Sequence, residues 1–348
     1  MSFTLSSDQH AHSWTQFARV NEAGVNTRLA AILNEFRRQA DCSILMGHKR
    51  MVFAGDLFHV RGRIEPEVFN PTHACLKEIA ERGVEIIAIP GNHDLQGKEA
   101  SALGNAMQTL GEIKNFRVVT KPELIDDVIM IPWIEDLAQL RDKLSKLAGS
   151  KQASKLDVVI HAPVNGVLKG LPDHGLEASE LQALGFRRVF AGHYHNALEL
   201  LPGVYSVGAT THQTWSDPDT NAGFWMVDGG ACEFSPTSAP LFVNQATTTV
   251  DENAVKGNYV RIQLKEADAD EIDKLRRDLI DAGAAGVVDH ASRKRTTTRT
   301  GSVAAAGATI EASVGEFIDK ELETKLDKSR ITIMSMEVLR TAQQRIAA

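Results

Sequence analysis

Short apolar runs that end in polar, chemically reactive residues recur along the first part of the chain. The runs are FTLS, RMVFAG, EIIAIPG, LDVVI and RRVFAG, and they are rich in Val, Ile and Phe. Runs of this length and composition are typical of buried β-strands. The polar residues that follow them are Asp8, Asp56, Asn92, His161 and His193. We therefore expect reactive side chains at the ends of strands.

Between these runs, apolar residues recur at the spacing of an amphipathic helix. One such segment starts at Thr27 (TRLAAILNEFRRQA), and another runs from Pro71 to Gly83, where the glycine is expected to end the helix. Strands that alternate with helices predict an α/β fold, in which ligands bind beyond the carboxyl ends of the strands. Each reactive residue is expected at that edge.

The pattern changes after Gly229. Strand-like pieces between Ala231 and Val250 are expected to close a main domain, which we place at residues 1–250. Residues 251–348 begin with a small α/β unit. It consists of a strand at Tyr259–Leu264, a helix at Asp268–Ala282 and the short strand GVVDH.

The C-terminal part has a different character. The polar stretch RKRTTTRTGSVAAAGATIEAS is typical of a linker or a mobile loop. A charged helical pattern then runs from Val314 to the end, with an interruption expected near Lys328–Ile331.

The composition excludes several classes of protein. The 348 residues carry a net charge of −7, which argues against nonspecific coating of nucleic acid, although a nuclease can hold a local positive patch within an acidic total. The three cysteines have no close spacing, so neither a disulfide framework nor a thiolate zinc site is expected. The N-terminus lacks the pattern of a secretory signal, and no run approaches the ~20 apolar residues of a membrane span. We expect a cytoplasmic protein that is not bound to a membrane.

Five polar segments carry the candidate chemistry. In chain order they are Asp8-Gln9-His10, Gly55-Asp56-Leu57-Phe58-His59, Gly91-Asn92-His93-Asp94, His161 and Gly192-His193-Tyr194-His195. Carboxylate, amide oxygen and imidazole are the ligands of hard or borderline divalent metals. Each segment alone could also have a purely structural role, as a turn, a core histidine or a surface pair. Their occurrence together, each at a predicted strand end, favours a metal centre.

The order of these segments resembles the calcineurin-like metallophosphoesterase superfamily, in which Asp-x-His, Gly-Asp, Gly-Asn-His-Asp/Glu, His and Gly-His-x-His follow one another. The resemblance spans Ser7 to Asp228, and every ligand position is filled. Within the superfamily, Gly-Asp-Leu-Phe-His is similar to SbcD-type DNA repair nucleases, and SDQHAHSW and SVGATTHQTWSD are similar to phage-encoded relatives. The resemblance implies a four-layer α/β/β/α sandwich with a small C-terminal α/β cap that leans over the cleft.

The resemblance also implies two divalent cations and a ligand set for each. The first ion would be held by Asp8, His10, Asp56 and His195, and the second by Asp56, Asn92, His161 and His193. Asp56 would bridge the ions, which acidify the attacking water. Manganese is the expected metal, with Mg²⁺, Fe²⁺ and Zn²⁺ as alternatives.

Three further residues are candidate catalytic groups by the same resemblance. His93 would face the scissile phosphate, as a stabiliser of the transition state or as proton donor to the leaving oxygen. Asp94 would orient the His93 imidazole. His59 would contact the phosphate and help to place DNA.

Substrate and partner contacts are less sharply defined by the sequence. Arg61 and Arg63 are candidate phosphate contacts, or they form an ordinary solvated face. The basic cluster at 293–299 either contacts DNA or is an ordinary charged loop. His212 is expected to support the loop after the last metal ligands. The implied partners are DNA, an SbcC-type ATPase subunit and a second copy of the chain, and the expected location is the host cytoplasm if the chain is phage-encoded.

Two other functions compete with an SbcD-like nuclease of DNA repair or recombination. One is a metallophosphoesterase that acts on a small phosphodiester or phosphomonoester. The other is a non-catalytic, metal-containing scaffold, against which the complete ligand set and His93 both argue.

Overall fold

The computed structural model describes residues 1–168, 170, 174–264, 267–290, 310–322, 324 and 326–346. The chain divides into two compact units, Met1–Arg293 and Lys294–Ala348. Among the helices so described, none combines the length and apolar character needed to cross a bilayer.

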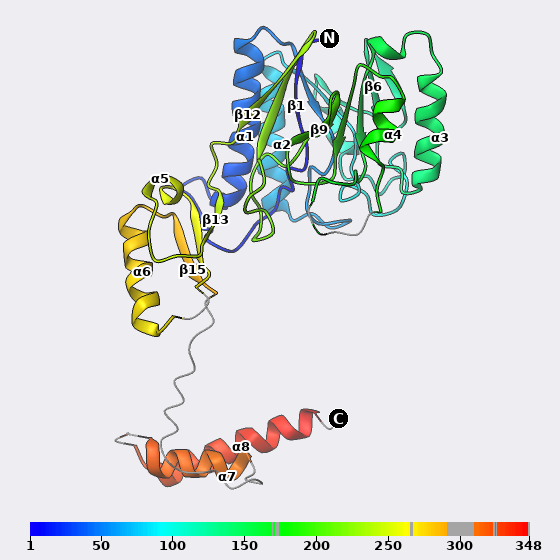
Figure 1. The fold of residues 1–348 in the computed structure, drawn as a ribbon. Helices are drawn as coiled ribbons and strands as arrows, with labels where there is room; N and C mark the ends of the chain where they lie inside the picture. Colours follow the sequence, from blue (N-terminus) through cyan, green and yellow to red (C-terminus); the bar gives the residue numbers. More distant parts are fainter. Residues whose placement is uncertain are drawn as a thin grey trace. The chain divides into compact units, whose positions relative to one another are not determined.

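Two six-stranded sheets form the main body of the first unit (Figure 1). The first has the order β12 (Ala231–Pro236), β11 (Gly223–Asp228), β1 (Phe3–Ser6), β2 (Arg50–Phe53), β3 (Glu85–Ala88) and β4 (Phe116–Val118). The second has the order β5 (Glu123–Ile125), β6 (Val128–Ile131), β7 (Asp157–His161), β8 (Arg188–Gly192), β10 (Val204–Ser206) and β9 (Leu198–Leu201). In the first sheet, strands β1 to β4 run parallel to one another. In the second sheet, β6, β7, β8 and β10 are parallel. The carboxyl ends of the parallel strands therefore lie at one edge of each sheet.

Four helices cover the outer faces of these sheets. They are α1 (Thr27–Leu45), α2 (Pro66–Glu81), α3 (Leu137–Ala148) and α4 (Ala178–Ala183). Two short 3₁₀ turns, η1 (Gln108–Glu112) and η2 (Ala153–Lys155), complete the connections.

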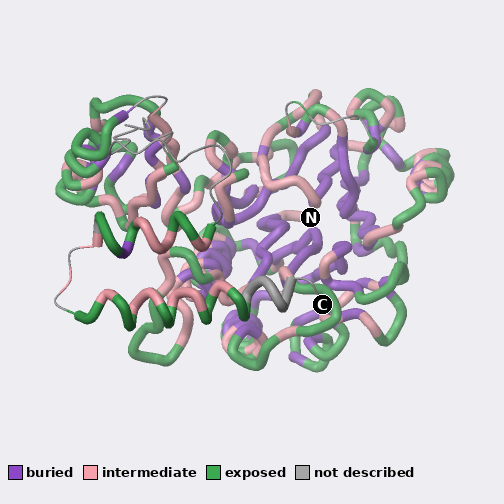
Figure 2. Tube along the Cα trace, turned by 90° about the horizontal axis from the view of Figure 1, so that it is seen from below, coloured by how far each residue is buried: buried purple, intermediate pink, exposed green. Residues whose placement is uncertain are grey.

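Successive residues of a strand point into different apolar layers, and the sandwich has three such layers. Met51 and Phe53 of β2 pack with α1 and α2, whereas Val52 between them faces the second sheet. In the same way Val158 of β7 packs with α3 and α4, and Val159 faces the first sheet. The buried positions accordingly lie along the strands, inside the helical layers (Figure 2). The predicted α/β/β/α sandwich is confirmed.

The helix predicted at Pro71 begins earlier. The structure places α2 at Pro66–Glu81, with Pro66 in the first turn, where a missing N–H costs nothing, and with Pro71 inside the helix. The predicted stop at Gly83 is confirmed, since this residue has a φ of +86°. The helix predicted at Thr27 starts there because the Asn26 side chain accepts the backbone N–H groups of Arg28 and Leu29.

A small parallel sheet follows the sandwich. It contains β13 (Phe242–Gln245), β14 (Tyr259–Ile262) and β15 (Gly286–Asp289), with α5 (Glu252–Val255) and α6 (Ala269–Asp281) as crossovers. Residues 231–250, which were expected to close the main domain, contribute strands to two different sheets. The strand β12 joins the first large sheet, but β13 pairs with β14, so the small sheet starts before residue 250. The boundary between domains at residue 250 stays a prediction.

The described residues of the second unit are mainly helical. It contains α7 (Ile310–Glu316), a π-helical turn η3 (Phe317–Glu321) and α8 (Lys328–Ile346). The predicted interruption lies just before Lys328, because α8 begins at that residue. The basic cluster at 293–299 lies outside the described residues.

Candidate metal centre

The two sheets bring the predicted ligands to one place. Asp8, Asp56 and Asn92 follow β1, β2 and β3, while His161 ends β7 and His193 follows β8. His161 Nδ1 lies 2.7 Å from the backbone oxygen of Ala54, which joins the end of β7 to the end of β2. The carboxyl edges of both sheets therefore form a common floor for the site.

The ligand atoms of the predicted ligands form two groups with one carboxylate between them, and His10 also belongs to a third group with His59 and His93. Asp8, His10 and His195 place ligand atoms within 4.8 Å of one another, as do Asp56, His161 and His193. Asp56 Oδ2 lies 3.6 Å from His10 Nε2 and 3.4 Å from His161 Nε2, so it faces both groups.

Asn92 belongs to the second group. Its side-chain oxygen lies 3.1 Å from His161 Nε2 and 3.0 Å from His193 Nδ1. All seven predicted ligands are thus neighbours, and their assignment to individual ions stays a prediction.

The backbone is unusual at these positions. Four of the eight described non-glycine residues with positive φ are predicted ligands, namely Asp8 (52°), His10 (45°), Asp56 (60°) and His193 (112°). Such conformations are costly for residues other than glycine and tend to persist at functional sites. The glycine before Asn92 is required by space, because a Cβ at Gly91 would collide with Asp56 Oδ1.

The donor set fits divalent cations. Asp8 Oδ1 and His10 Nδ1 are buried without a hydrogen-bond partner among the residues the structure describes. Buried polar atoms are normally satisfied, so these two atoms call for a ligand or water. The oxygen and imidazole donors suit Mn²⁺, Fe²⁺ or Zn²⁺.

The electrostatics of the site show the same preference for positive charge. Burial raises the pKa of Asp56, but His161 and His10 outweigh it and hold that pKa well below its usual range. Conversely, burial lowers the pKa of His161, and Asp56 outweighs it and raises the pKa to about 9. The negative charge of Asp56 thus favours positive charge at this position, which a bound divalent cation would also supply.

Asp94 has a different role from the one predicted. Its Oδ2 accepts the backbone N–H groups of Asp56 (2.8 Å) and Gly91 (2.9 Å), and its Oδ1 accepts that of Phe58 (3.1 Å). Burial and the charge of Asp56 raise the pKa of Asp94 to about 7, whereas the backbone donors act in the opposite direction. The prediction that Asp94 orients the His93 ring is wrong, because its carboxylate is used to clamp the loop after β2 onto the loop after β3.

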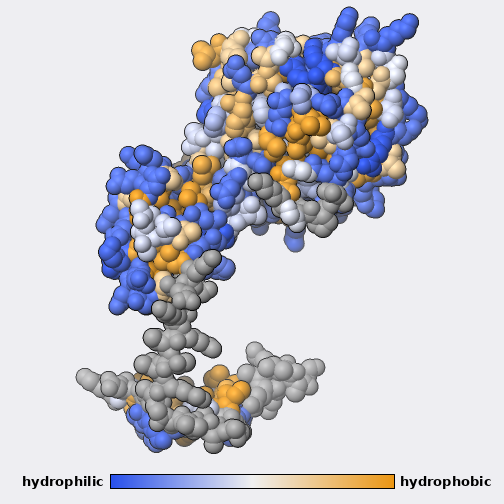
Figure 3. Space-filling model, in the orientation of Figure 1, coloured by the Kyte–Doolittle hydropathy of each residue, from blue (hydrophilic) through white to orange (hydrophobic). Residues whose placement is uncertain are grey.

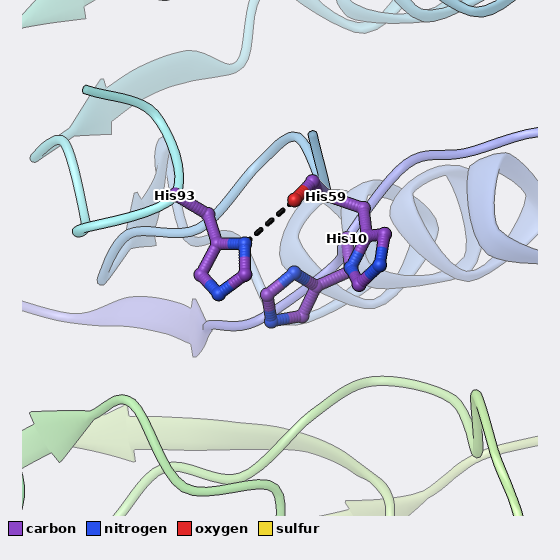
Figure 4. Close-up of side chains that lie close together, drawn as sticks. All are labelled: His10, His59 and His93. Atoms are coloured by element: carbon purple, nitrogen blue, oxygen red, sulfur yellow. Dashed lines mark hydrogen bonds between the residues drawn. The ribbon is translucent and has the colours of Figure 1, made fainter. Parts of the chain in front are cut away.

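His93 is oriented by a backbone group instead. Its Nδ1 lies 2.6 Å from the carbonyl oxygen of His59 (Figure 4). The backbone N–H of His93 donates to Asp56 Oδ1 at 2.8 Å. The rings of His93 and His59 are nearly parallel, with centroids 5.6 Å apart, and the His10 ring meets His93 edge-on at 4.7 Å. Burial lowers the pKa of His59 to about 4 and also lowers that of His93. Because the His59 carbonyl accepts the hydrogen on His93 Nδ1, the Nε2 atom of His93 can donate a hydrogen bond only when the ring is protonated.

The two candidate arginines are exposed. Arg63 lines a cavity of about 420 Å³ together with His12 and Phe58. Arg61 is close enough for its charge to lower the pKa of His93. Among the described residues neither arginine has an ion-pair partner, and their contact with phosphate stays a prediction.

Two residues of the site were not predicted as functional. Asp217 Oδ1 lies 3.1 Å from His195 Nδ1, and Trp133 stacks on the His193 ring at 5.5 Å. Asp217 lies 22 positions after His195, and no local spacing pattern links the two. The only sequence signal was the segment SVGATTHQTWSD, which drew attention to the loop but not to its aspartate. His212 does support that loop, through contacts with Thr220 and Phe242.

The comparisons with known proteins agree on the class of protein. The family model described as calcineurin-like phosphoesterase matches residues 1–197. The protein named exonuclease subunit 1, from enterobacteria phage T4, is 28% identical over 182 residues, which cover 50% of this chain and 51% of that protein. The match thus spans about half the length of this relative.

Two solved structures are among those matched by the chain. The E. coli phosphoesterase Yfce has 14% identity and a TM-score of 0.35, with 68% of this chain and 94% of that chain covered. The nuclease MPE of Pseudomonas putida has 15% identity and a TM-score of 0.27, with 66% and 85% covered.

Proposed function

The chain belongs to the calcineurin-like phosphoesterase family of metal-dependent hydrolases, and from that premise we propose that it is a nuclease that cuts DNA with two divalent cations. The observation that supports the two-ion mechanism is the position of Asp56. Its Oδ2 faces His10 and His161, which belong to separate ligand groups, at 3.6 and 3.4 Å. A carboxylate between two groups can hold two cations about 3.5–4 Å apart, as in other two-metal sites.

The protein residues would divide the work of phosphodiester hydrolysis. When bound, the cations supply Lewis acidity, which activates water and neutralises charge on the phosphate. His93 would bind the phosphate oxygen that carries the developing charge, or donate a proton to the leaving oxygen. The His59 carbonyl fixes the His93 ring, and the His59 imidazole would make a second contact to phosphate.

DNA is favoured over a small phosphate ester for two reasons. The relative from phage T4 is named an exonuclease subunit. Arg61 and Arg63 are exposed and have no ion-pair partner among the described residues, and the charge of Arg61 acts on His93, so both could hold a phosphate backbone that extends from the site. Such a function agrees with DNA repair or recombination and with an intracellular location.

The decisive experiment compares substrates in the presence of Mn²⁺. The protein should digest end-labelled single- or double-stranded DNA, and it should do so much more efficiently than it hydrolyses bis-p-nitrophenyl phosphate or cyclic nucleotides. Efficient hydrolysis of the small esters without cleavage of DNA would favour the small-molecule alternative. Two bound ions with no hydrolysis of any substrate would favour the scaffold.

The helical second unit is proposed as a docking surface for an ATPase subunit of the SbcC type. Apolar side chains are largely exposed on α8, with Ile333, Met334 and Val338 at 67%, 64% and 69%. Apolar surface is visible on the helical unit in Figure 3. Adjacent apolar and methionine side chains suit an adaptable protein interface. The relative from phage T4 is named a subunit, which agrees with a partner.

Removal of the second unit is expected to separate binding from catalysis. A chain that ends at Arg293, where the first compact unit ends, should keep Mn²⁺-dependent cleavage of short DNA and lose co-purification with the ATPase. A finer variant, Ile333→Glu with Val338→Glu, should also lose the partner, whereas Arg330→Glu on the same helix should keep it. Retention of the ATPase by the shortened chain would place the contact in the first unit.

A further inference from the structure

A loop between β10 and β11 connects the candidate metal centre to the small sheet. Its middle segment, residues 212–217, touches both. On one side Gln213 Nε2 donates to the backbone oxygen of Asp8 at 2.8 Å. On the other side the Trp215 ring packs edge-on against Phe242 of β13, with centroids 4.6 Å apart. The 212–217 segment is therefore one direct physical link between the two regions.

Asp217 is the residue of this segment that reaches the metal centre. Its side chain is 4% exposed, and its Oδ1 lies 3.1 Å from His195 Nδ1. Its Oδ2 accepts the backbone N–H groups of Gln213 and Thr214, both at 2.7 Å. Two backbone donors on one oxygen leave the other oxygen facing His195, so the carboxylate is fixed in rotation.

This arrangement determines which nitrogen of His195 is free. A carboxylate accepts hydrogen bonds only, so His195 Nδ1 must carry the hydrogen that it donates to Asp217. In the neutral ring the other nitrogen, Nε2, then holds a lone pair. A ring nitrogen of His195 lies within 4.8 Å of ligand atoms of Asp8 and His10.

We propose that Asp217 is a positioning residue, which holds His195 Nε2 toward the first cation, and that the 212–217 segment makes this position depend on the small sheet. The proposal rests on the ligand set of the proposed function. Carboxylate partners of metal-bound histidines commonly orient the ring and strengthen metal binding.

The connection to the small sheet is built from several contacts at the other end of the segment. The backbone N–H of Phe242, the first residue of β13, donates to His212 Nδ1 at 3.0 Å, and His212 Nε2 donates to the Thr220 carbonyl at 3.0 Å. The Arg261 guanidinium of β14 lies 4.7 Å from the centre of the Trp215 ring. A displacement of the small sheet would therefore pull on the segment that fixes Asp217.

The first test is metal binding by Asp217→Asn in the full chain. Manganese affinity, measured by calorimetric titration, should fall by roughly 10–100-fold for one of the two ions, because a neutral amide holds the ring less firmly and can reverse its tautomer. The paramagnetic resonance spectrum should change at substoichiometric loading from that of a coupled pair to that of a single ion. Asp219→Asn is the matched control, since Asp219 is exposed on the same loop and its φ of +68° suits asparagine. This control should bind both ions as the unaltered protein does.

The outcomes separate this proposal from the ligand assignment. If the unaltered protein binds fewer than two ions, the ligand set itself is wrong. If it binds two ions and Asp217→Asn binds them equally tightly, the positioning role is overturned. Should Asp217→Asn fail to fold, the tautomer of His195 in the metal-free native protein, read from ¹⁵N chemical shifts, still decides. A hydrogen on Nδ1 supports the role, and a hydrogen on Nε2 alone overturns it.

The dependence on the small sheet has its own test. Trp215→Ala removes the contact with Phe242 but leaves every proposed ligand and Asp217 in place. It should weaken binding of the same ion as Asp217→Asn does, by a smaller factor. Unchanged manganese affinity in a folded Trp215→Ala protein would overturn the coupling while leaving the role of Asp217 intact.

Discussion

Asp56→Asn is expected to yield a folded protein that no longer retains two manganese ions. In the native chain Asp56 Oδ2 faces His10 and His161, while Oδ1 accepts the N–H of His93. Asparagine can keep the bond to His93 through its oxygen and then turns an NH₂ group toward the ions. Because an NH₂ group is a donor and the bridging charge is lost, both proposed cation positions are weakened together. DNA cleavage should fall with the metal content.

The measurement is elemental analysis after reconstitution with Mn²⁺ and removal of loose metal, paired with circular dichroism. Glu35→Gln provides a matched control, because Glu35 is a buried carboxylate that bonds Arg38 and Ser238 away from the site. It should retain two ions per chain. An Asp56→Asn protein that also retains two ions at native affinity would rule out Asp56 as the bridge.

The position of the candidate site followed from simple properties of the sequence. Polar residues directly after short apolar runs lie at strand ends, and parallel strands bring those ends to one edge. Asp8, Asp56 and Asn92 could be placed beside one another by that reasoning alone. The loops that carry Asp56 and Asn92 also approach each other closely at Gly91, where a side chain would collide with Asp56 Oδ1.

The role of Asp94 could not be derived in this way. Residues adjacent in sequence usually point in different directions, so proximity to His93 in the chain gave no information about its side chain. The carboxylate instead satisfies backbone donors of the loops that carry Asp56 and Asn92. Which buried N–H groups need a partner depends on the loop conformation, and that is set by the whole fold.

The contact of Asp217 with His195 and the pairing of β13 with β14 could not be predicted for a related reason. Asp217 meets His195 only because the loop after β10 returns to the edge of the second sheet, and no periodicity reports such a return. The strand at Phe242–Gln245 was recognisable as a strand, but its alternation does not say which sheet it joins. Pairing partners of short strands are set by long-range contacts rather than by local pattern.

His93→Ala should separate metal binding from catalysis most clearly. The His93 ring is held by the His59 carbonyl and belongs to neither proposed ligand set. The variant is therefore expected to keep two manganese ions and to lose roughly 10²–10⁴-fold in the rate of DNA cleavage, the range for one acid–base group. His73→Ala is the control, because His73 stacks on Phe69 of α2 away from the ligands and should leave the rate unchanged.

The leaving group then distinguishes the two roles considered for His93. If the ring donates a proton to the leaving oxygen, the variant should lose more rate with DNA than with bis-p-nitrophenyl phosphate, because p-nitrophenolate leaves readily without a proton. If the ring stabilises charge on the phosphate oxygens, both substrates should lose rate by similar factors. In either case the metal content of the variant is the critical measurement. Loss of one ion together with activity would make His93 a ligand and would require the assignment of the site to be revised.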